Sequence, residues 1–236
     1  EDAAKTLNRS FHAAPTRPDL YFQAALFLIK HERYEETLDL LHQATRFSPA
    51  APELLLMQSI APAVRNRPDE AKGLRVKLHS LWPEWELPYL FHGIISQIYH
   101  NSEEARTLLE TAIVLGCNEP YAYYYLALAI IQPNPEDISG VERTLAKALE
   151  LSPEDPYIQA LAGRNALERK DYAAAVGHLT AAIRAQPDLL EAHWSLSQAY
   201  RALGEKEKLL GTVQEIERLS KEKPVPDGPA FPVRSL

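Results

Sequence analysis

The sequence predicts an all-α solenoid built from antiparallel helix pairs. Small residues recur on the first helix of each pair at steps of 34, 34, 34, 36 and 34 residues, namely Ala25, Ser59, Gly93, Ala127, Gly163 and Ser197. A series on the second helices shows the same two-residue insertion in the same unit: Ser10, Ala44, Leu78, Ala112, Ala148, Ala182 and Ile216. A fixed period of about 20–50 residues indicates a repeat architecture. Each unit can bury its apolar face only against its neighbours, so the units are expected to stack.

The stretch from Pro156 to Pro187 shows the repeating unit most clearly. Two helical patterns meet there at a polar turn, Lys170-Asp171. Pro156 fits the first turn of a helix, where the missing N–H removes no hydrogen bond, and Pro187 ends the second helix. Gly163 on the first helix leaves room for a close antiparallel neighbour.

The repeat resembles the tetratricopeptide repeat, a helix–turn–helix unit of 34 residues. Leu126-Ala127 and Ala162-Gly163 stand at the Leu-Gly pair of that family, and Tyr200 stands at its tyrosine. Its leading aromatic position is held by Tyr21, Tyr89 and Tyr123. The resemblance covers residues 1–219. It implies a right-handed superhelix in which the first helix of each pair lines the concave side.

The elements follow from this register. Residues 1–15 are expected to form the second helix of a truncated preceding repeat, because Ala3, Leu7, Ser10 and Pro15 fit its positions. Residues 16–221 are expected to hold six helix pairs, at approximately 18–48, 52–82, 86–116, 120–152, 156–186 and 190–220. The insertion falls in the loop Gln132-Pro133-Asn134-Pro135. Residues 222–236 contain four prolines, which favour an extended or disordered tail.

Composition narrows the class of partner. The formal net charge of −7 argues against a general nucleic-acid surface, which needs clustered Lys and Arg. No apolar run approaches the length of a membrane span. The single cysteine, Cys117, is compatible with the cytoplasm and the periplasm, so the compartment stays open. A second helix without its first helix at the start of the chain, together with the missing initiator Met, predicts a fragment of a longer protein.

Catalytic and metal-binding motifs are not found in the sequence. It has no glycine-rich phosphate loop, no nucleophile elbow and no zinc-protease helix motif. Among the eight histidines, His92 and His100 are two turns apart, but no Cys or carboxylate completes a ligand set. Cys117 is expected to be a packed thiol. We therefore expect a protein without enzymatic activity, cofactor or metal.

Helical spacing selects candidate binding residues on the concave face. They are Phe22, Leu26, Leu56, Ile60, Leu90, Ile94, Tyr121, Tyr124, Leu128, Tyr157, Arg164, Trp194, Gln198 and Arg201. This face is apolar over four pairs and then becomes polar. Either these side chains pack against one another in a tightly wound superhelix, or they line a groove for an apolar or proline-containing peptide. Tyr123 is expected to pack between helices, with Tyr121 and Tyr124 facing the groove.

Two functions are compatible with this surface. The first is a scaffold that binds an extended or helical protein segment in the concave groove. The alternative is self-association into a homo-oligomer, in which the groove is filled by the chain's own or a neighbour's tail. Pro229, Phe231 and Pro232 in that tail resemble a ligand for an aromatic groove. The family's clamp for a terminal carboxylate is not expected, because no cation pair stands at Phe22, Leu26, Leu56 and Ile60.

Overall fold

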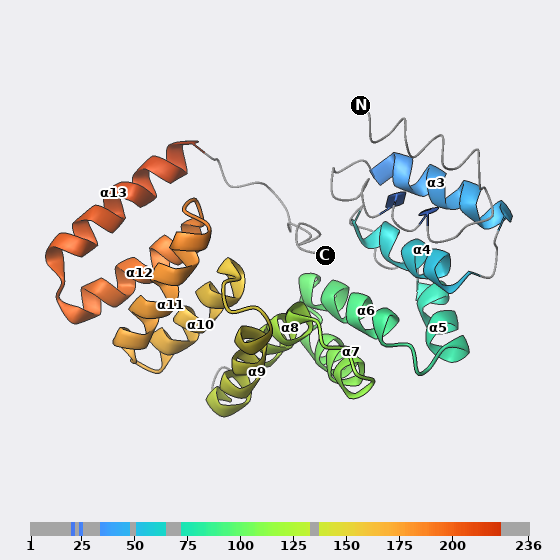
Figure 1. Ribbon diagram of the computed structural model, residues 1–236, viewed down its shortest axis with the longest axis horizontal. Coiled ribbons are helices and arrows are strands. Elements are labelled where there is room, and N and C mark those ends of the chain that lie inside the picture. The colour runs from blue at the N-terminus through green and yellow to red at the C-terminus, as the bar shows by residue number, and fades with distance from the viewer. Residues whose placement is uncertain are drawn as a thin grey trace.

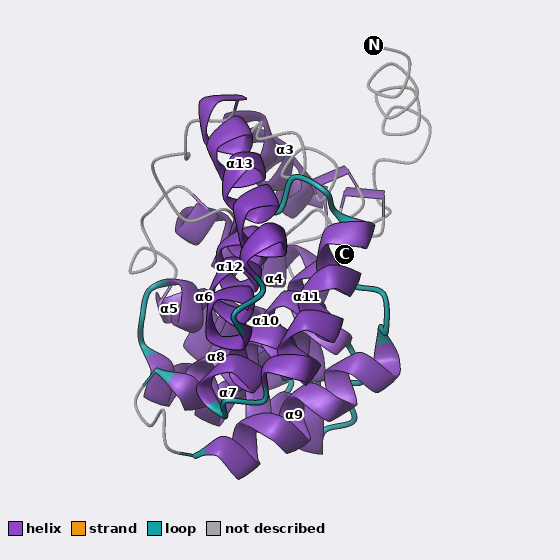
Figure 2. Cartoon of the chain, turned by 90° about the vertical axis from the view of Figure 1, so that its left-hand side faces the viewer, coloured by secondary structure: helices purple, strands orange, loops and turns teal. Residues whose placement is uncertain are grey.

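The computed structural model describes residues 20–21, 24–25, 34–47, 51–64, 72–132 and 137–222. Within these ranges every regular element is a helix, which confirms the all-α prediction (Figure 2). The helices are α3 (Tyr34–Phe47), α4 (Pro52–Val64), α5 (Lys72–Leu81), α6 (Glu86–Ile98), α7 (Ser102–Val114), α8 (Pro120–Ile131), α9 (Ile138–Leu151), α10 (Pro156–Glu168), α11 (Tyr172–Ala185), α12 (Leu190–Leu203) and α13 (Lys206–Glu222).

The helices follow one another along an arc (Figure 1). Helices α6, α8 and α10 lie on its inner side, and α7, α9 and α11 lie on its outer side. The core divides along the arc into three clusters, which join α3 to α6, α6 to α10 and α10 to α12. Burial is therefore local, as expected for a solenoid.

The repeated spacing of small residues in the sequence corresponds to one recurring contact between a small residue and a leucine. A Cβ atom added to Gly163 would stand 2.5 Å from Cγ of Leu179, and one added to Gly93 would stand 2.7 Å from Cγ of Leu109. Both leucines are fully buried. The glycines thus let the two helices of a pair approach to a separation that a side chain would prevent.

Gly163→Ala is expected to destabilise the fold, whereas Gly177→Ala is expected to stabilise it. Alanine favours a helix over glycine by about 0.5–1 kcal/mol at either position, but overpacking typically costs about 1–3 kcal/mol. The clash with Leu179 arises only at Gly163, since nothing lies within 4 Å of a Cβ at Gly177 of α11. Urea unfolding followed by circular dichroism measures both changes. Equal shifts of the midpoint in the same direction for the two variants would contradict the close packing.

The turns inside the pairs use short polar caps. Lys170 adopts a left-handed backbone with φ of 60°, and Asp171 then accepts a hydrogen bond from the N–H of Ala174 at 3.1 Å. His100 and Asn101 form the equivalent turn between α6 and α7. Each aspartate or asparagine satisfies an N–H that the first helical turn leaves unpaired.

The C-terminal boundary differs slightly from the sequence prediction. Helix α13 continues to Glu222, a residue that the sequence pattern assigned to the tail. The helix ends two residues before Pro224, and a residue that precedes proline is disfavoured in the α conformation. The predictions for residues 1–15, 133–136 and 223–236, and for Phe22 and Leu26, lie outside the described residues. Among the described helices, none has both the length and the apolar character of a membrane span.

Candidate functional site

Four aliphatic candidates of the predicted concave face belong to the core. Leu56, Ile60, Leu90 and Ile94 are each no more than 3% exposed. They are covered because neighbouring inner helices pack on one another: α4 contacts α6, and α6 contacts α8. Of the two readings of this face, mutual packing holds for these residues, and they offer no surface to a partner.

Three tyrosines of α8 contact one another ring to ring, and Tyr157 at the start of α10 lies near enough to add to the raised pKa of Tyr125. We call Tyr121, Tyr124, Tyr125 and Tyr157 the tyrosine cluster. Tyr124 meets Tyr121 and Tyr125 edge to face, with centroid distances of 5.7 and 5.1 Å. Tyr121 and Tyr125 are buried, whereas Tyr124 and Tyr157 are partly exposed. Edge-to-face pairs are favourable beyond the area they bury, so these ring contacts stabilise the arrangement of the tyrosines.

The phenols of Tyr124 and Tyr125 have raised pKa values. Burial raises the pKa of Tyr124, and the carboxylate of Glu191 on α12 raises it further. Burial likewise raises the pKa of Tyr125, and the adjacent Tyr124 adds to that shift. Tyr121 Oη donates to Oδ2 of Asp155 at 2.8 Å, and that carboxylate also caps α10 by accepting from the N–H of Tyr157 at 2.9 Å.

An exposed stripe on α12 borders the tyrosine cluster. The α12 stripe consists of Glu191, Trp194, Gln198 and Arg201, which are exposed at a spacing that puts them on one helix face. Trp194 is 52% exposed. Nη1 of Arg164 on α10 lies 3.0 Å from Oε1 of Glu191, so an ion pair ties the two inner helices together. We call the tyrosine cluster, Arg164 and the α12 stripe the aromatic surface.

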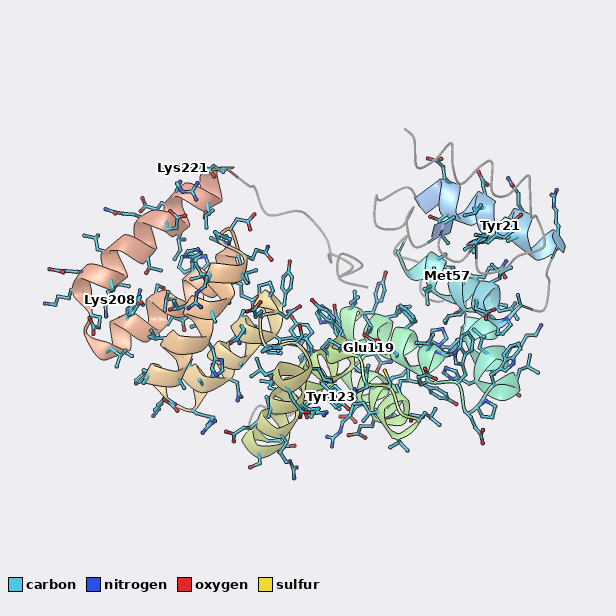
Figure 3. All side chains as sticks on the ribbon, in the orientation of Figure 1. Tyr21, Met57, Glu119, Tyr123, Lys208 and Lys221 are labelled. Carbon is cyan, nitrogen blue, oxygen red and sulfur yellow. The ribbon has the colours of Figure 1, made fainter. Side chains whose placement is uncertain are left out.

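Helix α8 carries two further residues singled out from the sequence, Tyr123 and Leu128. Tyr123 is partly buried beside α9 (Figure 3). The pKa of Lys147 on α9 is raised, mainly by Glu150 and to a smaller extent by the nearby phenol of Tyr123. This position agrees with the expectation that Tyr123 packs between helices. Leu128 is partly buried and packs against the core cluster of α6 to α10.

Comparison by sequence, both with models of protein families and with individual characterised proteins, gives no match. Solved structures do match. A chain of the APC/C hetero-tetramer Cut9-Hcn1 aligns with a TM-score of 0.77 and 18% identity over 92% of this chain. PilF of Pseudomonas aeruginosa aligns at 0.74 and 14% over 87%, and the type IV pilus biogenesis factor PilW at 0.72 and 13% over 89%.

The chain has the tetratricopeptide-repeat fold. It spans 43% of the matched chain of the hetero-tetramer, 97% of PilF and 94% of PilW. At these identities the likeness establishes the fold alone. Within the tetratricopeptide fold, the aromatic surface lies on first helices, the ones that the resemblance places on the concave side.

Three polar side chains that contact one another interrupt the apolar core between α4 and α6. We call Ser59, His79 and His92 the polar joint. His92 Nε2 lies 2.8 Å from Oγ of Ser59, and its Nδ1 lies 3.1 Å from Nε2 of His79. His92 is 2% exposed, and the ring of His79 stacks on Tyr89 at a centroid distance of 4.2 Å. These hydrogen bonds connect the buried faces of α4, α5 and α6.

The pKa values of both imidazoles reflect this burial. Burial, followed by the charges of His79 and Arg75, lowers the pKa of His92 to about 3. Burial also lowers the pKa of His79, opposed by a hydrogen bond to the carbonyl of Pro88. His92 is therefore neutral at physiological pH and acts as a donor at one ring nitrogen and an acceptor at the other.

Sequence reasoning missed three contributors. Asp155, Glu191 and the polar joint were not selected, although signals for two of them exist. Asp155 stands immediately before Pro156, where a helix cap is expected. Arg75 replaces the leucine that other units carry at Leu41, Leu109, Leu145 and Leu179, and it pairs with Glu104 at 2.9 Å beside His79. A charged residue in a leucine position marks the place where the apolar core gives way to polar contacts.

Proposed function

We propose that the chain is a non-enzymatic scaffold that binds a segment of another protein on the aromatic surface. The exposed ring of Trp194, one helical turn after Glu191 of the Arg164–Glu191 pair, carries this proposal. Tyr, Trp and Arg are enriched at protein interfaces and among the residues that dominate binding energy. Their rings bury large areas while a polar atom remains available to a partner.

The burial of the aliphatic inner residues supports this location. Neighbouring helices cover Leu56, Ile60, Leu90 and Ile94, so these four side chains are not available to a partner. The inner side at α8, α10 and α12 instead combines partly exposed rings with charges of both signs. Such a mixture suits a segment that has apolar side chains and polar ends.

One structurally similar protein also supports a protein partner. The chain matched with the highest TM-score among those described above comes from a complex named as a hetero-tetramer of Cut9 and Hcn1. A related fold can thus assemble with a different protein. For the present chain we infer a protein partner and leave its identity to experiment.

Peptides selected from a displayed library against the full chain test the proposal. Their binding is expected to weaken by about 2 kcal/mol or more, roughly 30-fold, in Trp194→Ala, as for a residue central to an interface. Val114→Ala is the control, because Val114 is 85% exposed at the end of α7, a helix on the outer side of the arc (Figure 1). Anisotropy of a labelled peptide gives each affinity. Selected peptides that bind both variants equally well place the binding site elsewhere and defeat the proposal.

A further inference from the structure

Helix α13 is the last of the described helices and lies at one end of the arc (Figure 1). It packs on α12, and the residues that it buries are Thr212, Ile216 and Leu219. Another side of the helix carries four residues at steps of four, three and four, which places them along one line. We call this set the α13 stripe: Lys206, Leu210, Val213 and Glu217. Val213 is partly exposed and the other three are exposed, Leu210 to 61%.

The equivalent side of the preceding second helix lies against the core. Val176 and Ile183 of α11 stand 34 residues before Leu210 and Glu217. Both are partly buried against a core cluster that α11 shares with α12. Because α13 is the last described helix, its stripe has no such cover within the described part of the chain, and Leu210 stays in contact with solvent.

The charged ends of the α13 stripe are available for pairing. The ion pairs of α13 among the described residues involve other side chains, namely Arg218 with Glu215 and Glu222, and Lys208 with Glu205. Lys206 and Glu217 are about 16 Å apart along the helix, at 1.5 Å per residue, which is too far for them to pair with each other. The stripe thus has a cation at its start, two apolar side chains in its middle and an anion at its end.

This order of side chains is complementary to itself in reverse. The span from Lys206 to Glu217 and the span from Leu210 to Val213 have the same centre, between Gly211 and Thr212. A second α13 laid antiparallel across that centre brings Lys206 of each copy opposite Glu217 of the other, with Leu210 opposite Val213 between them. A two-fold interface requires this reciprocity. Steps of four and three residues are also the spacing of the contact positions in paired helices.

We propose that the chain forms a homodimer in which the α13 stripes of two copies pack antiparallel. One helix face on each side makes a small interface, so the dissociation constant is expected to be about micromolar or higher. The inference does not depend on the proposed function, because the stripe lies on α13 and the aromatic surface lies on α8, α10 and α12.

Exchange of the two charges tests the dimer with the full chain. Sedimentation equilibrium from about 1 µM to 1 mM covers the expected range of affinity. Lys206→Glu or Glu217→Lys puts like charges at both symmetric pairs, and each is expected to weaken the dimer by about tenfold or more. Combining the two substitutions restores opposite charges, and the affinity is expected to recover. Arg143→Glu, at an exposed position of α9, changes the net charge as Lys206→Glu does and is expected to leave the dimer unchanged.

A mixture of the two single variants gives a second reading. A chain with Lys206→Glu and a chain with Glu217→Lys are each expected to be mainly monomeric at a concentration where the unmodified chain dimerises. Mixed together, they are expected to form a heterodimer, because each supplies the charge that the other lacks. A fluorescent label on one of the two variants identifies the mixed species by sedimentation, and circular dichroism verifies that both keep their helices.

Three results overturn the proposal. A full chain that stays monomeric over the whole range leaves the stripe to another protein or to residues 223–236. A dimer that neither single variant weakens uses a different surface. Loss of the dimer in both single variants, with recovery neither in the double variant nor in the mixture, excludes the antiparallel pairing of Lys206 with Glu217. Binding of the selected peptides is measured separately with Trp194→Ala, so failure of the dimer and failure of the proposed function are distinguishable.

Discussion

Acidification from pH 7 to pH 5 is expected to destabilise the fold by about 2 kcal/mol through His92 alone. The pKa of this imidazole falls from its usual 6.5 to about 3 in the folded chain. Below pH 6.5 the unfolded chain therefore takes up a proton that the folded chain does not, and protonation favours unfolding. The loss begins near pH 6.5 and grows until the pH reaches about 3. Above pH 6.5 both states are neutral at this position, and the contribution vanishes.

Replacement of His92 isolates this effect. His92→Gln is expected to lower stability at pH 7, because the polar joint loses a buried partner of Ser59 and His79. The slope of stability against pH between 7 and 5 is nevertheless expected to become shallower, since one linked proton is removed. His100→Asn is the matched control: His100 is exposed, and Asn tolerates its left-handed backbone. Urea unfolding at pH 7, 6 and 5 measures the three slopes. A slope for His92→Gln equal to that of the unmodified chain rules out this origin.

Leu179→Ala is expected to destabilise the fold by about 2–5 kcal/mol, the range for truncating a fully buried leucine. Leu179 is 0% exposed and fills the space above Gly163 between α10 and α11. Leu210→Ala, at an exposed position of α13, is expected to change stability by no more than about 0.5 kcal/mol. Chemical unfolding of both variants gives the comparison, and similar losses at the two positions would contradict the packing.

A double variant sharpens this second test. The methyl group of Gly163→Ala clashes with the Leu179 side chain, and truncation of Leu179 removes the clashing atoms. Gly163→Ala should therefore be much less harmful, or even favourable, in the Leu179→Ala background. Hydrogen exchange should locate the damage in α10 to α12 before α6 and α7, because repeats contact only their neighbours.

The register of the repeat was predictable from sequence because it has a direct steric origin. Where Gly93 faces Leu109 and Gly163 faces Leu179, only a small residue fits on the first helix, so the spacing of small residues reports helix contacts. The Lys170-Asp171 turn was predictable for a similar local reason, the demand of a helix start for a polar cap.

The degree of exposure on the inner side was not predictable in the same way. Periodicity places Leu56 and Trp194 on equivalent helix faces, yet one is fully buried and the other is half exposed. The difference depends on how closely successive inner helices approach, which is set by contacts between units rather than within them. Asp155 illustrates the same limit: its bond to Tyr121 joins residues 34 positions apart and depends on the stacking of two repeats.

The glycine–leucine contacts also have a mechanical consequence. A pair packed as closely as α10 and α11 resists compression, because any decrease in the helix separation drives Leu179 into the backbone at Gly163. Bending of the arc is then expected to be concentrated at the contacts between successive helix pairs. At the contact between α4 and α6 the restoring force comes from the buried polar bonds of Ser59, His79 and His92. From α8 to α12, packed apolar side chains are joined by the Tyr121–Asp155 hydrogen bond and by an ion pair between α10 and α12. An applied force is therefore expected to bend the arc unevenly, with a different stiffness at the contact between α4 and α6.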